Sequence, residues 1–122
     1  MTKLTIINTT RSNKSIQVNL AESFFSKLAG LMFRKCLSID SGILLSDSSD
    51  SIFNSSIHML FMNFDICAVW ISSSFEVVDV KIAKKWHLAY FPAKPAKYVL
   101  EAHPTRISDY SIGDQLHFDY EK

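Results

Sequence analysis

The residue best suited to hold an anion is Arg34, which ends the run G-L-M-F-R at residues 30–34. A guanidinium group presents a planar fork of N–H donors that can bind a carboxylate or a phosphate through two parallel hydrogen bonds. Arg34 could therefore hold a ligand. The favoured interpretation is an ion pair with Glu101 or Asp114 that ties a helix end to the sheet, because half-buried charges persist mainly when they are paired.

A second candidate is His58, which lies in an apolar segment together with Phe61. Histidine is the side chain whose ordinary pKa lies nearest neutrality, so His58 could act as a general base or bind a metal. With Asp65 or Glu101 as its partner and Arg34 nearby, it would supply the acid and base of a hydrolase. The favoured interpretation is a histidine packed at the core or its rim.

The familiar signatures of metal and cofactor sites do not occur in the sequence. Its histidines lack the His-x-His and His-x-x-x-His spacings of zinc ligands, and no Cys-x-x-Cys pair joins them. Asp47 and Asp50 lie in a serine-rich stretch without the glycine and bidentate glutamate of a calcium loop. Glycine-rich phosphate loops and nucleophile elbows are also missing. We therefore expect no metal and no cofactor.

The length of 122 residues suits one core, and we expect a single domain over residues 1–122. Lys and Arg number 13 against 12 Asp and Glu, which gives a formal net charge of +1. This balance predicts no nucleic-acid partner and no attraction to an anionic membrane surface. The local cluster Lys81, Lys84 and Lys85 is typical of the exposed end of a strand.

The expected location is the cytoplasm. The first residues lack the apolar stretch and cleavage site of a secretory signal. The longest apolar candidate for a membrane span, residues 57–71, is interrupted by His58 and Asp65, so we expect no membrane partner. In a reducing compartment Cys36 and Cys67 are expected to be free, buried thiols.

The elements that would position these residues begin with an N-terminal hairpin. Apolar residues alternate with polar ones over residues 4–6 and 16–20, and a polar stretch separates the two runs. Residues 21, 24, 25 and 28 then share one face of a short helix, with a glycine at residue 30 as its C-cap. The polar residues 46–51 are expected to form a mobile loop.

The second half of the chain predicts further strands. Residues 57–71 indicate one or two strands buried on both faces, followed by an antiparallel partner over residues 75–82. Two prolines mark residues 86–97 as an extended loop, and residues 98–101 and 116–120 predict the last strands. We therefore expect a mainly β (α+β) domain, a single curved antiparallel sheet or small β-barrel with one short helix.

Three motif groups in a fixed order carry a family resemblance. They are G-L-M-F-R at residues 30–34 with G-I-L-L at 42–45, I-H-M-L-F-M at 57–62, and Y-V-L-E at 98–101 with I-G-D at 112–114. Over about residues 16–119 the chain resembles the prokaryotic family called domain of unknown function 192. The resemblance implies a compact, mostly β fold with one helix, and it brings no established reaction.

The chain departs from the family pattern at two places. Cys67 stands where the family usually has an aspartate, and Asp65, on the same face of a strand, is expected to replace it spatially. The glycine that commonly follows V-L-E is absent, and residues 103–105 read His-Pro-Thr instead. The turn there must therefore be built differently.

A full set of fold-defining positions without a recognisable nucleophile and base indicates a small binding or accessory domain with no established activity. Its scaffold would offer a peptide, protein or small ligand a groove near Arg34, His58 and Phe61, with Glu101 and Asp114 as further candidates. The alternative is the hydrolase described above. A third possibility is self-association through an edge strand.

Overall fold

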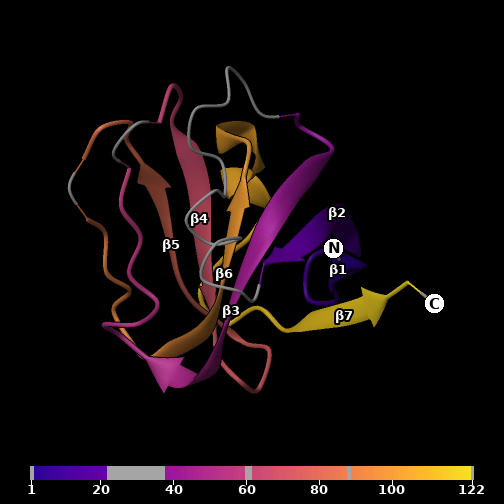
Figure 1. The fold of residues 1–122 in the computed structure, drawn as a ribbon. Helices are drawn as coiled ribbons and strands as arrows, with labels where there is room; N and C mark the ends of the chain where they lie inside the picture. Colours follow the sequence, from indigo (N-terminus) through magenta and orange to yellow (C-terminus); the bar gives the residue numbers. More distant parts are fainter. Residues whose placement is uncertain (1, 22–37, 60–61, 88, 122) are drawn as a thin grey trace.

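Seven strands form one curled sheet (Figure 1). The computed structural model describes residues 2–21, 38–59, 62–87 and 89–121. The strands are β1 (Lys3–Asn8), β2 (Lys14–Ala21), β3 (Ser41–Ser51), β4 (Ile66–Ile71), β5 (Val77–Ala83), β6 (Ala96–Ala102) and β7 (Leu116–Tyr120), and a short 3-10 helix, η1, spans Pro104–Asp109. Their order across the sheet is β5-β4-β6-β3-β2-β1-β7. The predicted mainly β fold is confirmed.

The described neighbours in the sheet are antiparallel except for β2 and β3, which run parallel. Parallel neighbours need a long crossover connection, and residues 22–40 separate these two strands in the chain. The sequence prediction of an antiparallel sheet therefore misses one pair. Apolar alternation shows that a strand exists but carries no information about the direction of its neighbour.

The two edges of the sheet meet at one end. Glu76 bridges Gln115, the N–H of Val77 donates to the Asp114 carbonyl at 2.9 Å, and the N–H of Gly113 donates to the Val77 carbonyl at 2.8 Å. These contacts join the beginning of β5 to the segment that leads into β7. The sheet is thus a half-barrel whose interior can be filled by side chains.

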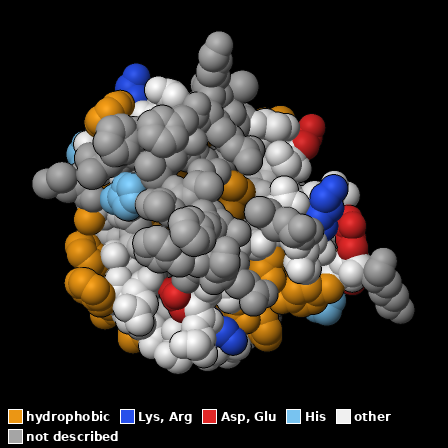
Figure 2. Space-filling model, viewed as in Figure 1, with side chains coloured by type: hydrophobic (Ala, Val, Ile, Leu, Met, Phe, Trp, Pro, Cys, Tyr) orange, Lys and Arg blue, Asp and Glu red, His pale blue; other side chains and the backbone are white. Residues whose placement is uncertain are grey.

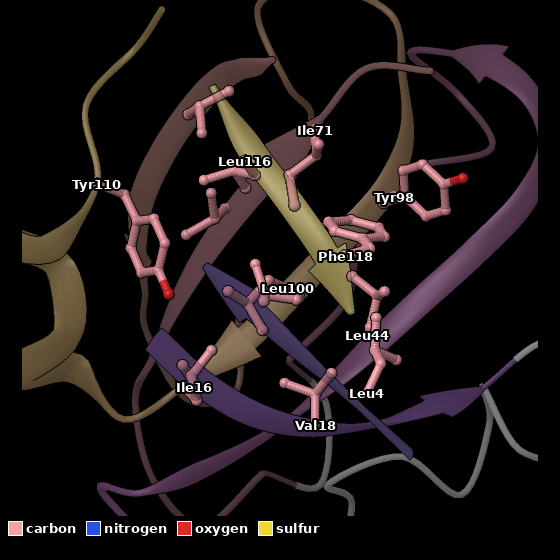
Figure 3. Close-up of a cluster of buried hydrophobic side chains, with 14 of the residues drawn as sticks. Leu4, Ile16, Val18, Leu44, Ile71, Tyr98, Leu100, Tyr110, Leu116 and Phe118 are labelled. Atoms are coloured by element: carbon pink, nitrogen blue, oxygen red, sulfur yellow. The ribbon is translucent and has the colours of Figure 1, made fainter. Parts of the chain in front are cut away.

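The interior of the half-barrel holds the main core (Figure 3). Leu4 of β1 and Val18 of β2 pair in register and are both buried, as the period of two in the sequence predicted. Beside them the rings of Phe75, Tyr98 and Phe118 contact one another at centroid distances of 4.9–5.9 Å. Apolar burial of this extent is the main source of stability in a small domain.

A second cluster, which we call the outer cluster, covers the opposite face of β3, β4, β5 and β6. Two segments lie over it, residues 51–59 and residues 84–96 apart from residue 88, and we call them the covering loops. Ile57 and Tyr90 bridge the two loops through a pair of backbone hydrogen bonds. The indole N–H of Trp70 in β4 donates to the Ser55 carbonyl at 2.7 Å. The members of the outer cluster are Ala21, Ile43, Ile57, Met59, Met62, Ile66, Ala68, Trp70, Ala83, Ala96 and Val99.

The prediction of a mobile loop over the serine-rich residues 46–51 is wrong. Residues 46–51 continue β3, and Ser46 and Ser51 pair with Tyr98 and Ala96 of β6 across an irregularity in the register. The strand persists because its backbone is paired, whatever the polarity of its side chains. The Asp50 carboxylate also accepts hydrogen bonds from the N–H and the hydroxyl of Ser73, at 2.9 and 2.7 Å.

Other predicted strands are present in the structure. The N-terminal hairpin is β1–β2, and the predicted strand over residues 75–82 is β5, which pairs antiparallel with β4. Every residue of β4 is buried, in agreement with the predicted strand buried on both faces. Ala21 ends β2, while the rest of the predicted helix lies outside the described residues.

Candidate functional site

Glu101 places a carboxyl group on the outer face of the sheet. In β6 it pairs in register with Ile43 of β3 and Ala68 of β4, and directly opposed residues project to the same face. Both neighbours belong to the outer cluster. Only 7% of Glu101 is exposed, and none of the residues that the structure describes forms a hydrogen bond or ion pair with its carboxyl group.

Burial raises the pKa of Glu101 to about 7, because the carboxylate loses its hydration among apolar neighbours. Near neutral pH the group can therefore either donate a hydrogen bond or carry a negative charge. Acids shifted in this way by burial are concentrated at functional sites. Glu101 is the predicted site residue whose surroundings depart most from those of an ordinary surface carboxylate.

The predicted partners of Glu101 differ in their placement. Arg34 and Phe61 lie outside the described residues, so the ion pair between Arg34 and Glu101 stays a prediction. His58 is exposed on a covering loop. Within the described parts of the chain, no hydrogen bond joins His58 to Asp65 or Glu101. The hydrolase built on His58, Asp65 or Glu101 and Arg34 therefore stays a prediction.

Asp65 is engaged elsewhere. Its carboxylate accepts a hydrogen bond from the N–H of Lys85 at 2.9 Å and contacts the ammonium group of Lys84 at 3.4 Å. The backbone hydrogen bond from Lys85 lowers the pKa of Asp65, which makes it a weaker base. Asp65 precedes β4 and is partly exposed, whereas Cys67 is fully buried in the barrel interior. Asp65 therefore does not replace the family aspartate at the position of Cys67.

Asp114 has a structural set of partners. One carboxylate oxygen, Oδ2, accepts from the side-chain amide of Asn8 at 2.8 Å, the N–H of Ser111 at 2.9 Å and the Arg11 guanidinium at 3.0 Å. These contacts tie the β1–β2 turn to the segment before β7. The structure thus pairs Asp114 with Arg11, and the ion pair of Arg34 with Glu101 or Asp114 stays a prediction because Arg34 lies outside the described residues.

Two polar contacts were missed in the sequence. Asn8 follows Leu4 and Ile6 at the spacing of inward-facing residues, and a polar residue at such a position was the available signal of a buried network. Asp79, a charged residue in the middle of β5, is only 6% exposed. Its carboxylate accepts from the N–H of Ala93 at 2.8 Å and thereby holds a covering loop.

The turn after β6 is built without the family glycine. His103 caps η1 by accepting a hydrogen bond from the N–H of Thr105 at 3.2 Å, and Pro104 occupies the first turn. A side-chain cap and a proline therefore perform locally what a glycine turn would do. The histidine ring is committed to this cap, which leaves it a poor candidate for chemistry.

The described residues contain no group of three or more His, Cys, Asp or Glu side chains that could hold a metal ion. Cys67 is a free thiol, and burial raises its pKa to about 12, so it stays protonated near neutral pH. Within the same part of the chain, no helix is long and apolar enough to cross a membrane.

Comparison with protein families identifies the family whose motifs the sequence resembles. The family model called domain of unknown function 192 (DUF192), described as an uncharacterized ACR, matches residues 5–118. The chain belongs to this family. The match includes β1, so the DUF192 domain begins earlier than the resemblance over residues 16–119 indicated.

Relatives of the DUF192 chain are UPF0127 proteins. The protein of Pyrococcus furiosus is 33% identical over 117 residues, which cover 93% of this chain and 97% of that protein. The protein of Thermococcus kodakarensis is 41% identical over 85 residues, which cover 70% of this chain. The match spans only 52%, about half, of the Thermococcus protein. The family has no established activity.

Two solved structures share the fold. A candidate transcription regulator of Sinorhizobium meliloti 1021 superposes with a TM-score of 0.82 at 20% identity, over 96% of this chain and 92% of that one. A protein of unknown function from Novosphingobium aromaticivorans gives 0.82 at 18% identity, over 93% and 83% of the two chains. At these identities the likeness concerns the half-barrel alone.

Proposed function

We propose that the DUF192 domain is a small binding module whose ligand meets the carboxyl group of Glu101. The observation that carries the proposal is the burial of this carboxyl without a partner among the described residues. Burying an acid costs free energy, so the presence of a carboxyl on the outer face, without a partner among the described residues, favours a role in binding. The flanking Ile43 and Ala68 favour a ligand with an apolar body.

The chemistry of the ligand follows from the carboxyl. An ionised Glu101 would bind an ammonium or guanidinium group most strongly, because charge-assisted hydrogen bonds in a poorly hydrated site are the strong ones. We therefore expect a small molecule or peptide side chain that joins a cationic group to a short alkyl chain. Its simplest probe is n-butylamine, with n-butanol as the uncharged match.

The first test measures thermal stability with each probe. Butylamine should raise the melting temperature of the native protein and leave Glu101→Gln unchanged, whereas butanol should raise neither. The matched control is Glu121→Gln, which makes the same chemical change at an exposed carboxylate and should respond to butylamine as the native protein does. An equal response of all three proteins would contradict the proposal.

A second test separates a ligand site from the predicted ion pair. The free energy of unfolding is measured for Arg34→Met, Glu101→Gln and the double variant. If Arg34 is the partner of Glu101, the two single effects will be strongly non-additive, by about 1–3 kcal/mol. That result would make Glu101 a structural residue and end the proposal. Additive effects, with Glu101→Gln neutral or stabilising, would support it.

We also propose a cytoplasmic location, supported by the free thiol of Cys67, since free cysteines are usual in reducing compartments. The measurement is fractionation of the native host cells followed by detection with an antibody. Recovery of the protein outside the cytoplasmic and inner-membrane fractions would contradict this location.

A further inference from the structure

The outward side of the covering loops carries exposed apolar side chains. The loops lie side by side, because Ser51 pairs with Ala96 and Ile57 bridges Tyr90. Ile57 and Tyr90 pack inward on the outer cluster, so the exposed residues of the same loops project away from the sheet. Figure 2 shows hydrophobic side chains gathered along the left edge of the molecule, where Figure 1 places these loops.

Four large apolar residues of the covering loops are exposed. Phe53 is 77% exposed, Trp86 54%, Phe91 44% and Ile52 41%. Single exposed apolar residues are common on protein surfaces, but a group of them on one layer is typical of an interaction site. The layer as a whole therefore has the composition of a contact surface.

The charges on the covering loops have one sign. Residues 80–100 contain five lysines and no acidic residue, and residues 51–64 contain no acidic residue. Lys81 and Lys84 each contact a nearby carboxylate at 3.4 Å, those of Asp79 and Asp65. Lys85 and Lys94 are exposed, and within the described part of the chain neither ammonium group forms an ion pair, although the Asp65 carboxylate accepts from the N–H of Lys85. The layer is therefore both apolar and cationic.

Hydrogen bonds to the backbone fix the conformation of the covering loops. The ammonium group of Lys81 donates to the Phe91 carbonyl at 2.6 Å, and the N–H of Trp86 donates to the Met59 carbonyl at 2.7 Å. Trp86 has a φ of +68°, a conformation that costs energy for a bulky residue and persists where surrounding contacts impose it. The exposed indole is thus presented on a fixed backbone.

We propose that the surface formed by Ile52, Phe53, Lys85, Trp86, Phe91 and Lys94, here called the aromatic–lysine surface, binds a membrane that contains anionic lipid. Aromatic and aliphatic side chains enter the interfacial region of a bilayer, and lysines beside them are attracted to anionic headgroups.

A lipid surface suits these residues better than a nucleic acid does. Single-stranded nucleic acids bind by stacking their bases on aromatic rings along a basic groove. Insertion into the interfacial region of a bilayer is favourable for any exposed apolar side chain, including Ile52. The earlier expectation of no membrane partner used the net charge of the whole chain and the lack of a spanning segment. Neither observation reports how charge is distributed over one face.

The test is co-sedimentation of the full chain with vesicles of phosphatidylcholine, with and without phosphatidylserine. We expect binding that requires phosphatidylserine and weakens as salt is added. Of the two tryptophans, Trp70 is fully buried, so a blue shift of the fluorescence on binding reports Trp86. Lys85→Gln with Lys94→Gln should weaken binding roughly 25-fold, since each lysine contributes about fivefold.

The apolar part is tested with Phe53→Ser and Phe91→Ser, which should reduce both binding and the blue shift. Matched controls are Lys14→Gln and Ile112→Ser, exposed residues outside the covering loops, which should bind as the native protein does. Circular dichroism checks that each variant is folded. Absence of binding to phosphatidylserine vesicles, or equal loss in the control variants, would overturn the proposal. Binding of a single-stranded oligonucleotide in place of vesicles would do the same.

Discussion

The carbonyl oxygen of Glu101 lies only 2.6 Å from the position that a Cβ atom on Gly42 would occupy. Gly42 begins the G-I-L-L motif, and Glu101 ends the V-L-E motif. The two motifs thus meet in the structure, at the contact between β3 and β6. The requirement for glycine comes from the closeness of a backbone atom, which cannot rotate away as a side chain would.

Replacing Gly42 by alanine should therefore push β3 away from β6. We expect Gly42→Ala to lower the free energy of unfolding by about 1–3 kcal/mol, as overpacking does in other well-packed sites. Urea unfolding measures the change, and Ser41→Ala, at the exposed preceding residue, is the control that should differ little from the native protein. A Gly42→Ala protein as stable as the native one would show that the strands separate there without cost.

Replacing Glu101 by glutamine should change the dependence of stability on pH. The pKa of Glu101 is raised from 4.5 to about 7 in the folded protein, so the folded state holds the proton more tightly than the unfolded state. The contribution of Glu101 to the free energy of unfolding is therefore fully present below pH 4.5 and is lost as the pH rises through about 7. At higher pH the loss amounts to about 3 kcal/mol.

In Glu101→Gln this loss should disappear. The difference in unfolding free energy between Glu101→Gln and the native protein should therefore grow in favour of the variant across that pH range. The measurement is urea unfolding at several pH values, with Glu121→Gln as the control for removing one carboxylate. A pH dependence identical in all three proteins would show that the Glu101 carboxylate is compensated by a positive charge.

The Asp114 carboxylate should matter far more to stability than its arginine partner. Asp114→Ala removes the acceptor for Asn8, Arg11 and Ser111 and should lower the free energy of unfolding by about 3 kcal/mol. Arg11→Ala should cost less than about 1 kcal/mol, because the Arg11 side chain is 44% exposed and its ion pair is screened by water.

Chemical denaturation of both variants tests this asymmetry. Asp119→Ala, at an exposed position of β7, is the matched control and should have little effect. Equal losses in Arg11→Ala and Asp114→Ala would mean that the ion pair, and not the hydrogen bonds of Asn8 and Ser111, stabilises this corner of the fold.

The hydroxyl of Tyr110 is fully buried and has no hydrogen-bond partner among the described residues. Removing an unpaired buried hydroxyl avoids its desolvation cost, so Tyr110→Phe should raise the free energy of unfolding by about 1 kcal/mol. Tyr90→Phe is the opposite case, because the Tyr90 hydroxyl accepts from the N–H of Lys84 at 2.9 Å. It should lower stability by a similar amount.

The melting temperatures of Tyr110→Phe and Tyr90→Phe, each compared with that of the native protein, test these opposite changes. A loss of stability in Tyr110→Phe comparable to that in Tyr90→Phe would reveal a partner of Tyr110, such as a bound water inside the half-barrel.

Local pattern was sufficient for most strands. The alternation in β1 and β2, the apolar run of β4 and the final strand β7 could all be predicted, because a residue on a strand is buried on one face at a period of two. The polar half of β3 could not, since its pairing with β6 depends on backbone contacts that its side chains do not encode.

The candidate site, too, was predictable from the sequence only in part. The sequence by itself determined which residue types stand at which strand positions, and so the family, the mainly β fold and Glu101 as a carboxyl within an apolar strand. Only the tertiary structure decided that Glu101 lies between Ile43 and Ala68, that Asp114 pairs with Arg11, and that the two covering loops share one face. These contacts join residues far apart in the chain, and their geometry is fixed by the register and curl of the whole sheet.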